Sequence, residues 1–282
     1  MEFGWCGEGF TFLGKEDPPE EAKYIILQIP FDSTTTSLPG AREGPFFVIK
    51  ASRDLELYDE ETGFDLERVK IHTLNPLDVN RGNVEDTLQR VKDTVEEIKK
   101  HNKIPVMIGG EHSPSIGALS AFDDEVLFVC FDAHGDLRDE YEGSKYSNAC
   151  VCRRISENKK TLILGVRSLS REEFESSKEN KNVTLVLMKD TESFIKEKLA
   201  NFVKGKKVYI SIDLDVLDVK GVGTPEPGGM NYNSLLKALK TIIQNSQLVG
   251  FDVMECNPML DPNYTPYLAA KLIKKIISYN EL

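Results

Sequence analysis

Residues 126–136 read Val126-Leu127-Phe128-Val129-Cys130-Phe131-Asp132-Ala133-His134-Gly135-Asp136, six apolar residues followed at once by three potential metal ligands. A continuous apolar run is typical of a strand that is buried on both faces of a parallel sheet. Similar runs, most of them rich in β-branched residues, recur along the chain at 24–29, 104–108, 126–131, 162–166, 183–187, 208–212 and 248–253. We therefore predict strands at these positions.

Helical patterns lie between the apolar runs. The clearest covers residues 83–102, where apolar side chains spaced by three and four form one stripe and Asn83 is the expected N-cap. We expect further helices at 115–121, 191–202, 232–244 and 265–278. Alternating strands and helices predict an α/β fold, a three-layer α/β/α sandwich with a mostly parallel central sheet. No linker-like composition divides the chain, so we expect a single domain over residues 1–282.

The composition limits the classes of partner. The chain has 46 acidic and 35 basic side chains, a net charge of −11, which disfavours nucleic acid and favours a small cationic molecule. No apolar run approaches the roughly 20 residues that span a bilayer, so we expect no membrane contact and a cytoplasmic protein. The odd count of 5 cysteines, including Cys150 and Cys152, predicts ordinary reduced thiols.

Potential metal ligands follow several of the predicted strands directly. Asp132, His134 and Asp136 come after one strand at steps of two, and Asp213 and Asp215 repeat this step after another. His112 follows a third strand through two glycines. On an extended backbone, residues two apart share one face, so these side chains can converge. Any one of these groups alone could be a helix cap or a hydrogen-bonded structural histidine.

Two imidazoles and four carboxylates without cysteine make a harder site than structural zinc prefers. Manganese suits such a set, and magnesium, iron, cobalt and nickel are the alternatives. Two divalent ions would balance the four Asp charges, and two metals roughly 3.5–4 Å apart make a bridging water nucleophilic at neutral pH. The sequence therefore predicts a binuclear manganese site.

Several motifs of the chain resemble those of the ureohydrolases, the arginase and agmatinase family. The motifs are Gly109-Gly110-Glu111-His112-Ser113, Asp132-Ala133-His134-Gly135-Asp136 and Ser211-Ile212-Asp213-Leu214-Asp215-Val216-Leu217-Asp218, and the match extends to 39–45, 165–167, 223–229 and 252–258. The resemblance covers nearly the whole chain. It implies two manganese ions per subunit, a three-layer fold around a parallel sheet, and a homotrimer or homohexamer.

The resemblance also implies roles for individual residues. His112, Asp132, Asp136 and Asp213 would bind one metal, and Asp132, His134, Asp213 and Asp215 the other. A bridging hydroxide would attack the guanidinium carbon. Asp136 would carry the proton to the leaving amine, and Glu255 would pair with the guanidinium, which suits a planar, bidentate ion pair.

The resemblance is to agmatinases in particular, because the loop at 137–147 is acidic in its first half. It implies hydrolysis of agmatine to putrescine and urea, a step of polyamine biosynthesis, with Asp139 and Glu140 near the distal ammonium. These acids could instead form a solvated face, and Arg138 keeps a guanidino acid such as guanidinobutyrate open. Arginine, aminopropylagmatine and formiminoglutamate are the other candidate substrates.

Two stretches depart from the family pattern. Asn148 stands where many relatives have a histidine that assists proton transfer, and asparagine cannot titrate. The loop that begins Asp218-Val219-Lys220-Gly221 is shorter than in most relatives. A weakly active, metal-bound homologue that binds guanidino compounds is therefore the alternative to an enzyme.

Overall fold

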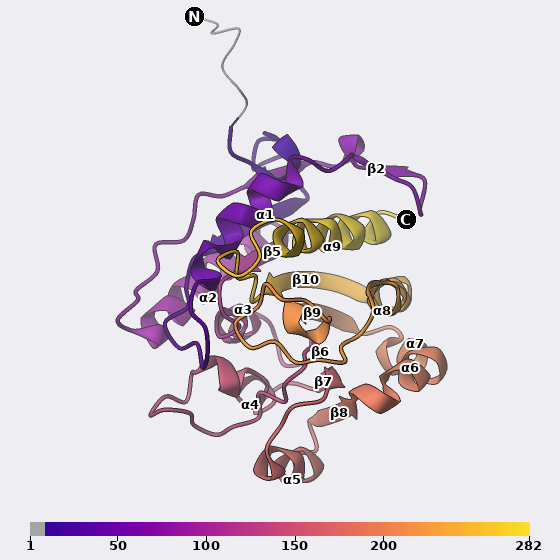
Figure 1. Ribbon diagram of the computed structural model, residues 1–282. Coiled ribbons are helices and arrows are strands. Elements are labelled where there is room, and N and C mark those ends of the chain that lie inside the picture. Colours follow the sequence, from indigo (N-terminus) through magenta and orange to yellow (C-terminus); the bar gives the residue numbers. More distant parts are fainter. Residues whose placement is uncertain (1–8) are drawn as a thin grey trace, which may run out of the picture.

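A computed structural model describes residues 9–282, and a parallel sheet forms its centre (Figure 1). Its strands are β1 (Tyr24–Ile29), β4 (Ile71–Thr73), β5 (Ile104–Gly109), β6 (Leu127–Phe131), β7 (Thr161–Val166), β8 (Val183–Leu187), β9 (Lys207–Asp213) and β10 (Gln247–Met254). The order across the 8-stranded sheet is β4-β1-β5-β10-β9-β6-β7-β8, and all neighbouring strands are parallel. This order places β5, β10, β9 and β6 side by side in the middle of the sheet.

Helices cover both faces of the sheet (Figure 1). They are α1 (Gly44–Ser52), α2 (Val84–Lys100), α3 (Pro114–Ser120), α4 (Val151–Ile155), α5 (Arg171–Glu179), α6 (Met188–Glu197), α7 (Leu199–Val203), α8 (Tyr232–Asn245) and α9 (Tyr264–Asn280). Helix α9 packs against α1 and α8 on one face, while α2, α3 and α4 pack in sequence on the other. Short 3-10 turns occur at Phe12–Gly14, Ala41–Glu43, Leu66–Arg68, Asn148–Cys150 and Leu214–Val216. Among residues 9–282, no helix is long and apolar enough to cross a bilayer.

The alternation of side chains along each strand divides the core between the two faces. In β6, Leu127, Val129 and Phe131 join the cluster under α1, α8 and α9, whereas Phe128 and Cys130 join the cluster under α2, α3 and α4. Both clusters are buried, so the continuous apolar run at 126–131 is the sequence of a strand covered on both faces. The predicted α/β/α sandwich with its parallel sheet is confirmed.

The differences from the sequence prediction concern short elements. The structure adds the three-residue edge strand β4, the hairpin of β2 (Tyr58–Asp59) and β3 (Phe64–Asp65), and helices α1, α4 and α5. The helix predicted at 191–202 starts earlier and is broken into α6 and α7 at Lys198, whose backbone is not helical (φ −123°). The added strands and helices carry too few residues for a clear apolar period in the sequence.

A buried ion pair fixes the β2–β3 hairpin to α9. The Nζ atom of Lys275 lies 3.0 Å from Oδ2 of Asp59, and both side chains are at most 2% exposed. Asp59 also accepts hydrogen bonds from the amide and the hydroxyl of Thr62. Glu60 (3.3 Å) and Glu61 (3.4 Å) also contact the Lys275 ammonium, but their side chains are 65% and 36% exposed, so Asp59 is the fully buried member of this group.

We predict that Asp59→Ala lowers the free energy of unfolding by about 2 kcal/mol, because the Lys275 ammonium loses its fully buried partner and keeps only the partly exposed Glu60 and Glu61. Urea unfolding followed by circular dichroism measures the change. Glu175→Ala is the control, since it removes an exposed ion pair with Lys178 and should cost less than about 0.5 kcal/mol. Equal midpoints for the two variants would contradict this role of the ion pair.

Candidate metal centre

The side chains predicted to bind metal come from three strand ends at one edge of the sheet. His112 follows β5, Asp132, His134 and Asp136 follow β6, and Asp213 and Asp215 lie at the end of β9. The last strand, β10, runs between β5 and β9 and ends directly before Glu255. Because these neighbouring strands are parallel, their carboxyl ends meet, and the residues that follow them share one site.

The two glycines before His112 allow a close approach of the backbone. A Cβ atom on Gly110 would collide with the carbonyl oxygen of Phe31. Without that side chain, the Gly110 amide donates to the carbonyl of Ile29 (2.9 Å) and the Glu111 amide to that of Phe31 (2.8 Å). The chain therefore turns at the strand end and presents His112 to the edge of the sheet.

The imidazole of His112 faces three carboxylates. Its Nδ1 atom lies 3.2 Å from Asp132, 3.5 Å from Asp136 and 3.3 Å from Asp213, measured to Oδ2 in each case. This nitrogen is buried and has no hydrogen-bond partner in the described chain. An orphaned nitrogen surrounded by carboxylate oxygens is the donor set that a divalent cation binds.

A second group of ligands lies beside the first. The Nδ1 atom of His134 is 2.7 Å from Oδ2 of Asp215 and 3.6 Å from Oδ1 of Asp132, and these ligand atoms lie within 4.8 Å of one another. Asp132 thus directs one oxygen toward His112 and the other toward His134. The structure brings the six predicted ligands together, and Asp132 has the position that a carboxylate shared by two ions requires.

Negative charge accumulates at this edge of the sheet. Burial and the charge of Asp132 raise the pKa of Asp136 to about 7, and burial with neighbouring carboxylates raises the pKa of Asp213 well above its usual range. Burial opposes protonation of His134, but its contacts with Asp132 and Asp215 prevail and raise its pKa to about 12. Within residues 9–282, His112 and His134 contact these four Asp side chains and no Lys or Arg does, a charge balance that suits a bound cation.

Polar groups behind the two histidines hold their rings. The Nε2 atom of His112 lies 2.9 Å from the hydroxyl of Ser211, which donates to Asp252, and Asp252 also accepts from Ser115 (2.9 Å). All of these side chains are buried. Such outer partners orient metal-binding imidazoles and fix their tautomer.

The ring of His134 has a more open environment. Its Nε2 atom is 3.9 Å from Oε1 of Glu226, and the two side chains are 24% and 33% exposed. The two predicted metal positions therefore differ in their outer support, although both are built from imidazole and carboxylate.

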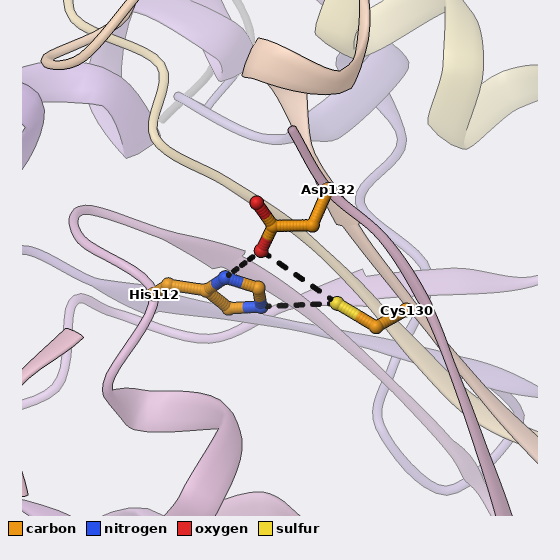
Figure 2. A group of neighbouring side chains, drawn as sticks. All are labelled: His112, Cys130 and Asp132. Carbon is orange, nitrogen blue, oxygen red and sulfur yellow. Dashed lines mark hydrogen bonds and ion pairs between the residues drawn. The ribbon is translucent and has the colours of Figure 1, made fainter. Parts of the chain in front are cut away.

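A cysteine also lies beside the cluster (Figure 2). The Sγ atom of Cys130 is 4.0 Å from Nε2 of His112 and 3.8 Å from Oδ2 of Asp132, and the three residues form a group that could hold a metal ion. Burial raises the pKa of this thiol well above its usual range, and a protonated thiol is a poor ligand. Cys130 also faces the edge of the His112 ring opposite to Nδ1 (Figure 2), so we keep the six oxygen and nitrogen ligands as the candidate set.

The cluster opens into a cavity of about 350 Å³. Predicted ligands line its floor together with Glu255, while the half-buried Asn148, Arg138 and Tyr141 line its wall. Glu255 accepts a hydrogen bond from the amide of His112 (2.9 Å), which leaves Oε2 free of any hydrogen bond within residues 9–282. Burial and the neighbouring Glu111 raise the pKa of Glu255 to about 8.

The acidic loop lies farther from the cluster than its sequence suggested. Asp139 forms ion pairs with Arg153 (3.4 Å) and Arg154, and it lines a neighbouring cavity together with Glu140. Neither acid lines the cavity over the metal ligands. The two cavities share Arg138, so they lie on either side of this side chain.

The sequence prediction missed Cys130 and Ser211 as neighbours of the cluster. Both lie two residues before a predicted ligand, Cys130 before Asp132 and Ser211 before Asp213. The step of two therefore continues back into the strand, a signal that the sequence already contained. Glu226 carried no such signal, because it reaches His134 from a distant loop.

The chain is similar over nearly its whole length to known proteins. The model of the Arginase family matches residues 22–278. The N(1)-aminopropylagmatine ureohydrolase of Thermococcus kodakarensis is 38% identical over 97% of this chain and 96% of its own, and the agmatinase of Pyrococcus horikoshii is 36% identical over 92% of each. The crystal structure of the agmatine ureohydrolase of Thermoplasma volcanium is similar with a TM-score of 0.85 and 34% identity, over 94% of this chain and 92% of that one.

We predict that Ser211→Ala weakens binding of Mn²⁺ by about 10- to 100-fold, because His112 loses the hydroxyl that orients its ring. Calorimetric titration of the metal-free protein measures the affinity. Ser193→Ala is the control, since this exposed serine on α6 bonds only within its own helix. An unchanged affinity for Ser211→Ala would mean that the sheet alone orients His112.

Proposed function

The chain belongs to the arginase family and is a hydrolase of amidino C–N bonds, and we propose that it converts agmatine to putrescine and urea. The observation that carries the proposal is the meeting of the six candidate metal ligands, five of which line one cavity together with Glu255, while Asp132 lies between the two histidines. A guanidinium needs an anionic partner beside the reacting centre, and Glu255 is placed to be that partner, because the positive charge of a bound guanidinium lowers the pKa of this buried carboxyl.

We propose manganese as the metal, with two ions per subunit. The ligands are carboxylates and imidazoles, and Asp132 offers an oxygen to each half of the cluster. When bound, two such ions lower the pKa of a shared water and stabilise negative charge on the attacked group. The fit rests on the orphaned Nδ1 of His112 and on the unpaired carboxylates around it.

The side chains of this chain supply the remaining parts of the reaction. Glu255 orients the guanidinium through its free oxygen while its other oxygen is held by the His112 amide. Hydrolysis adds the hydroxyl of water to the guanidinium carbon, breaks the bond from this carbon to the alkyl-bearing nitrogen, and transfers the proton of water to the leaving amine, so a group must carry that proton. Asp136 lies 3.5 Å from Nδ1 of His112 and lines the cavity with Glu255, so it is the carboxylate placed to carry this proton.

N(1)-aminopropylagmatine is the second candidate substrate. Asp139 and Glu140 line the neighbouring cavity beyond Arg138. Neither side chain lines the cavity over the metal ligands. Asp139 is already paired with Arg153 and Arg154, so Glu140 is the acid that a tail lengthened by an aminopropyl group would extend toward. The relative from Thermococcus kodakarensis carries this substrate in its name.

We also propose a cytoplasmic homotrimer or homohexamer. Large apolar side chains are exposed on α1 and near the start of α9, with Phe46 50%, Met259 59% and Tyr264 63% exposed, which suits a subunit contact. Cys130, Cys150, Cys152 and Cys256 are buried free thiols, which suits a reducing compartment, and Cys6 lies outside the described residues.

We predict that the manganese-loaded protein releases urea from agmatine faster than from N(1)-aminopropylagmatine, guanidinobutyrate or arginine. Urea release from the four compounds, measured side by side, gives the order. Asp213→Ala is the negative control, because it removes a carboxylate that faces His112. Bound manganese without urea from any compound would favour the homologue that only binds guanidino ligands.

We predict that Asn148→His raises turnover by at least about tenfold, because a positioned acid or base typically contributes 10²- to 10⁴-fold. Asn148 lines the cavity with Asp136, so an imidazole there would share its proton transfer. Steady-state kinetics with agmatine measures kcat, and Asn148→Gln is the matched control because its amide cannot titrate. A lower or unchanged kcat would show that the cavity has adapted to the amide.

A further inference from the structure

Three loops that surround the cavity meet at the side chain of Thr34. The amide of Thr34, in the loop after β1, donates to Oε2 of Glu111 (2.6 Å), and its hydroxyl donates to Oε1 of the same carboxylate. The amide of Asn148, in the segment after β6, donates to the Thr34 hydroxyl (3.1 Å). The Thr34 hydroxyl thus donates to Glu111 in the loop after β5 and accepts from Asn148 in the segment after β6.

The side chain of Glu111, which binds Thr34, and the backbone of Glu111 are themselves held in place. Its side chain is fully buried, and it accepts a further hydrogen bond from Ser113 (2.5 Å). Its backbone lies between Gly110 and His112 and is held by the hydrogen bond from its amide to the carbonyl of Phe31. Hydrogen bonds to a buried carboxylate are stronger than those between neutral groups, so Thr34 is tied firmly to the turn that carries His112.

The far end of the Thr34 loop is also held. The Leu38 amide donates to the carbonyl of Gly223 (3.3 Å), and the side-chain amide of Asn257 donates to the carbonyls of Leu38 (3.2 Å) and Pro39 (3.1 Å). Thr36, between these two anchors, lines the cavity, as Asn148 does. The position of the cavity wall therefore depends on a segment anchored at Glu111 on one side and at Asn257 on the other.

We propose that Thr34 is a positioning residue, which fixes Asn148 and Thr36 in the cavity wall and so sets the space available to the tail of the substrate. Thr34 itself does not line the cavity, so it acts through these neighbours. The kinetic part rests on the proposed function, because it concerns how the guanidino substrate fits. The contact itself can be tested without any reaction.

The first test measures hydrogen exchange of the Asn148 amide in the metal-loaded protein. Thr34→Val removes the hydroxyl at nearly constant volume, and Thr34→Ser keeps it. We expect exchange of the Asn148 amide to be at least about tenfold faster in Thr34→Val and nearly unchanged in Thr34→Ser, since only the first loses the acceptor. Thr241→Val on α8 is the control, because that hydroxyl bonds within its own helix.

The second test compares KM and kcat for agmatine in the same variants. We expect KM to rise about tenfold in Thr34→Val, with kcat within about twofold and unchanged Mn²⁺ affinity, and Thr34→Ser to restore KM. A purely structural loss would instead lower metal binding and kcat together. If Thr34→Val does not fold, Thr34→Ala removes the hydroxyl without placing a second methyl group beside Glu111.

The outcomes separate this proposal from the proposed function. Equal amide exchange in Thr34→Val and Thr34→Ser would overturn the proposal, and so would fast exchange with an unchanged KM. If the wild-type protein released no urea, the proposed function would fail. The dissociation constant of agmatine, measured by calorimetry, would then replace KM, and the same comparison of variants would still decide the role of Thr34.

Discussion

The structure depends on bringing like charges together at the edge of a buried sheet. Four Asp side chains from the ends of β6 and β9 surround two imidazoles, without an ion pair to Lys or Arg within residues 9–282. Like charges at such distances repel strongly where water is excluded. Backbone amides offset part of this cost, because Ala133 donates to Asp215, His134 to Asp132, and Asp215 to Asp213. The remainder is what a divalent cation can neutralise, so the fold holds a site that favours cation binding.

Backbone strain is found at the same place. Asp136 (φ 48°) and Glu255 (φ 65°) have the left-handed conformation that residues with a side chain rarely adopt. Both lie on the floor of the cavity, and both are assigned a role in handling the guanidinium or its proton. Strain of about 1–3 kcal/mol per residue persists only where surrounding structure enforces it. Here the amide of Arg153 donates a hydrogen bond to the Asp136 carbonyl, which supports Asp136. Glu255 is supported by two hydrogen bonds with the turn after β5, from its amide to Gly110 and from the amide of His112 to its carboxylate.

The sequence predicted the parts of the site that follow a local rule. Apolar runs located seven strands of the central sheet, and the step of two after them located five of the six candidate ligands, because alternation along an extended chain places such residues on one face. His112 was located by its place after a strand and two glycines. Contacts between distant loops follow no such rule. Glu226 beside His134, Thr34 between Glu111 and Asn148, and the arginines of α4 that pair with Asp139 became visible only in the structure. The acidic loop at 137–147 is an example. Its sequence shows the acidic residues but does not show that Asp139 is paired with arginines of α4.

The unequal surroundings of the two histidines bear on how the centre is filled and emptied. The side chain of His112 is 1% exposed and rests on a buried Ser211–Asp252 chain, whereas that of His134 is 24% exposed and faces a glutamate open to solvent. Water reaches the His134 half first, so an ion there would exchange with solvent faster than one enclosed beside His112. A partly loaded protein would then retain the inner ion and lack the outer one. For two ions bound as proposed, the two residence times, rather than a single affinity, would describe the response to a falling metal supply.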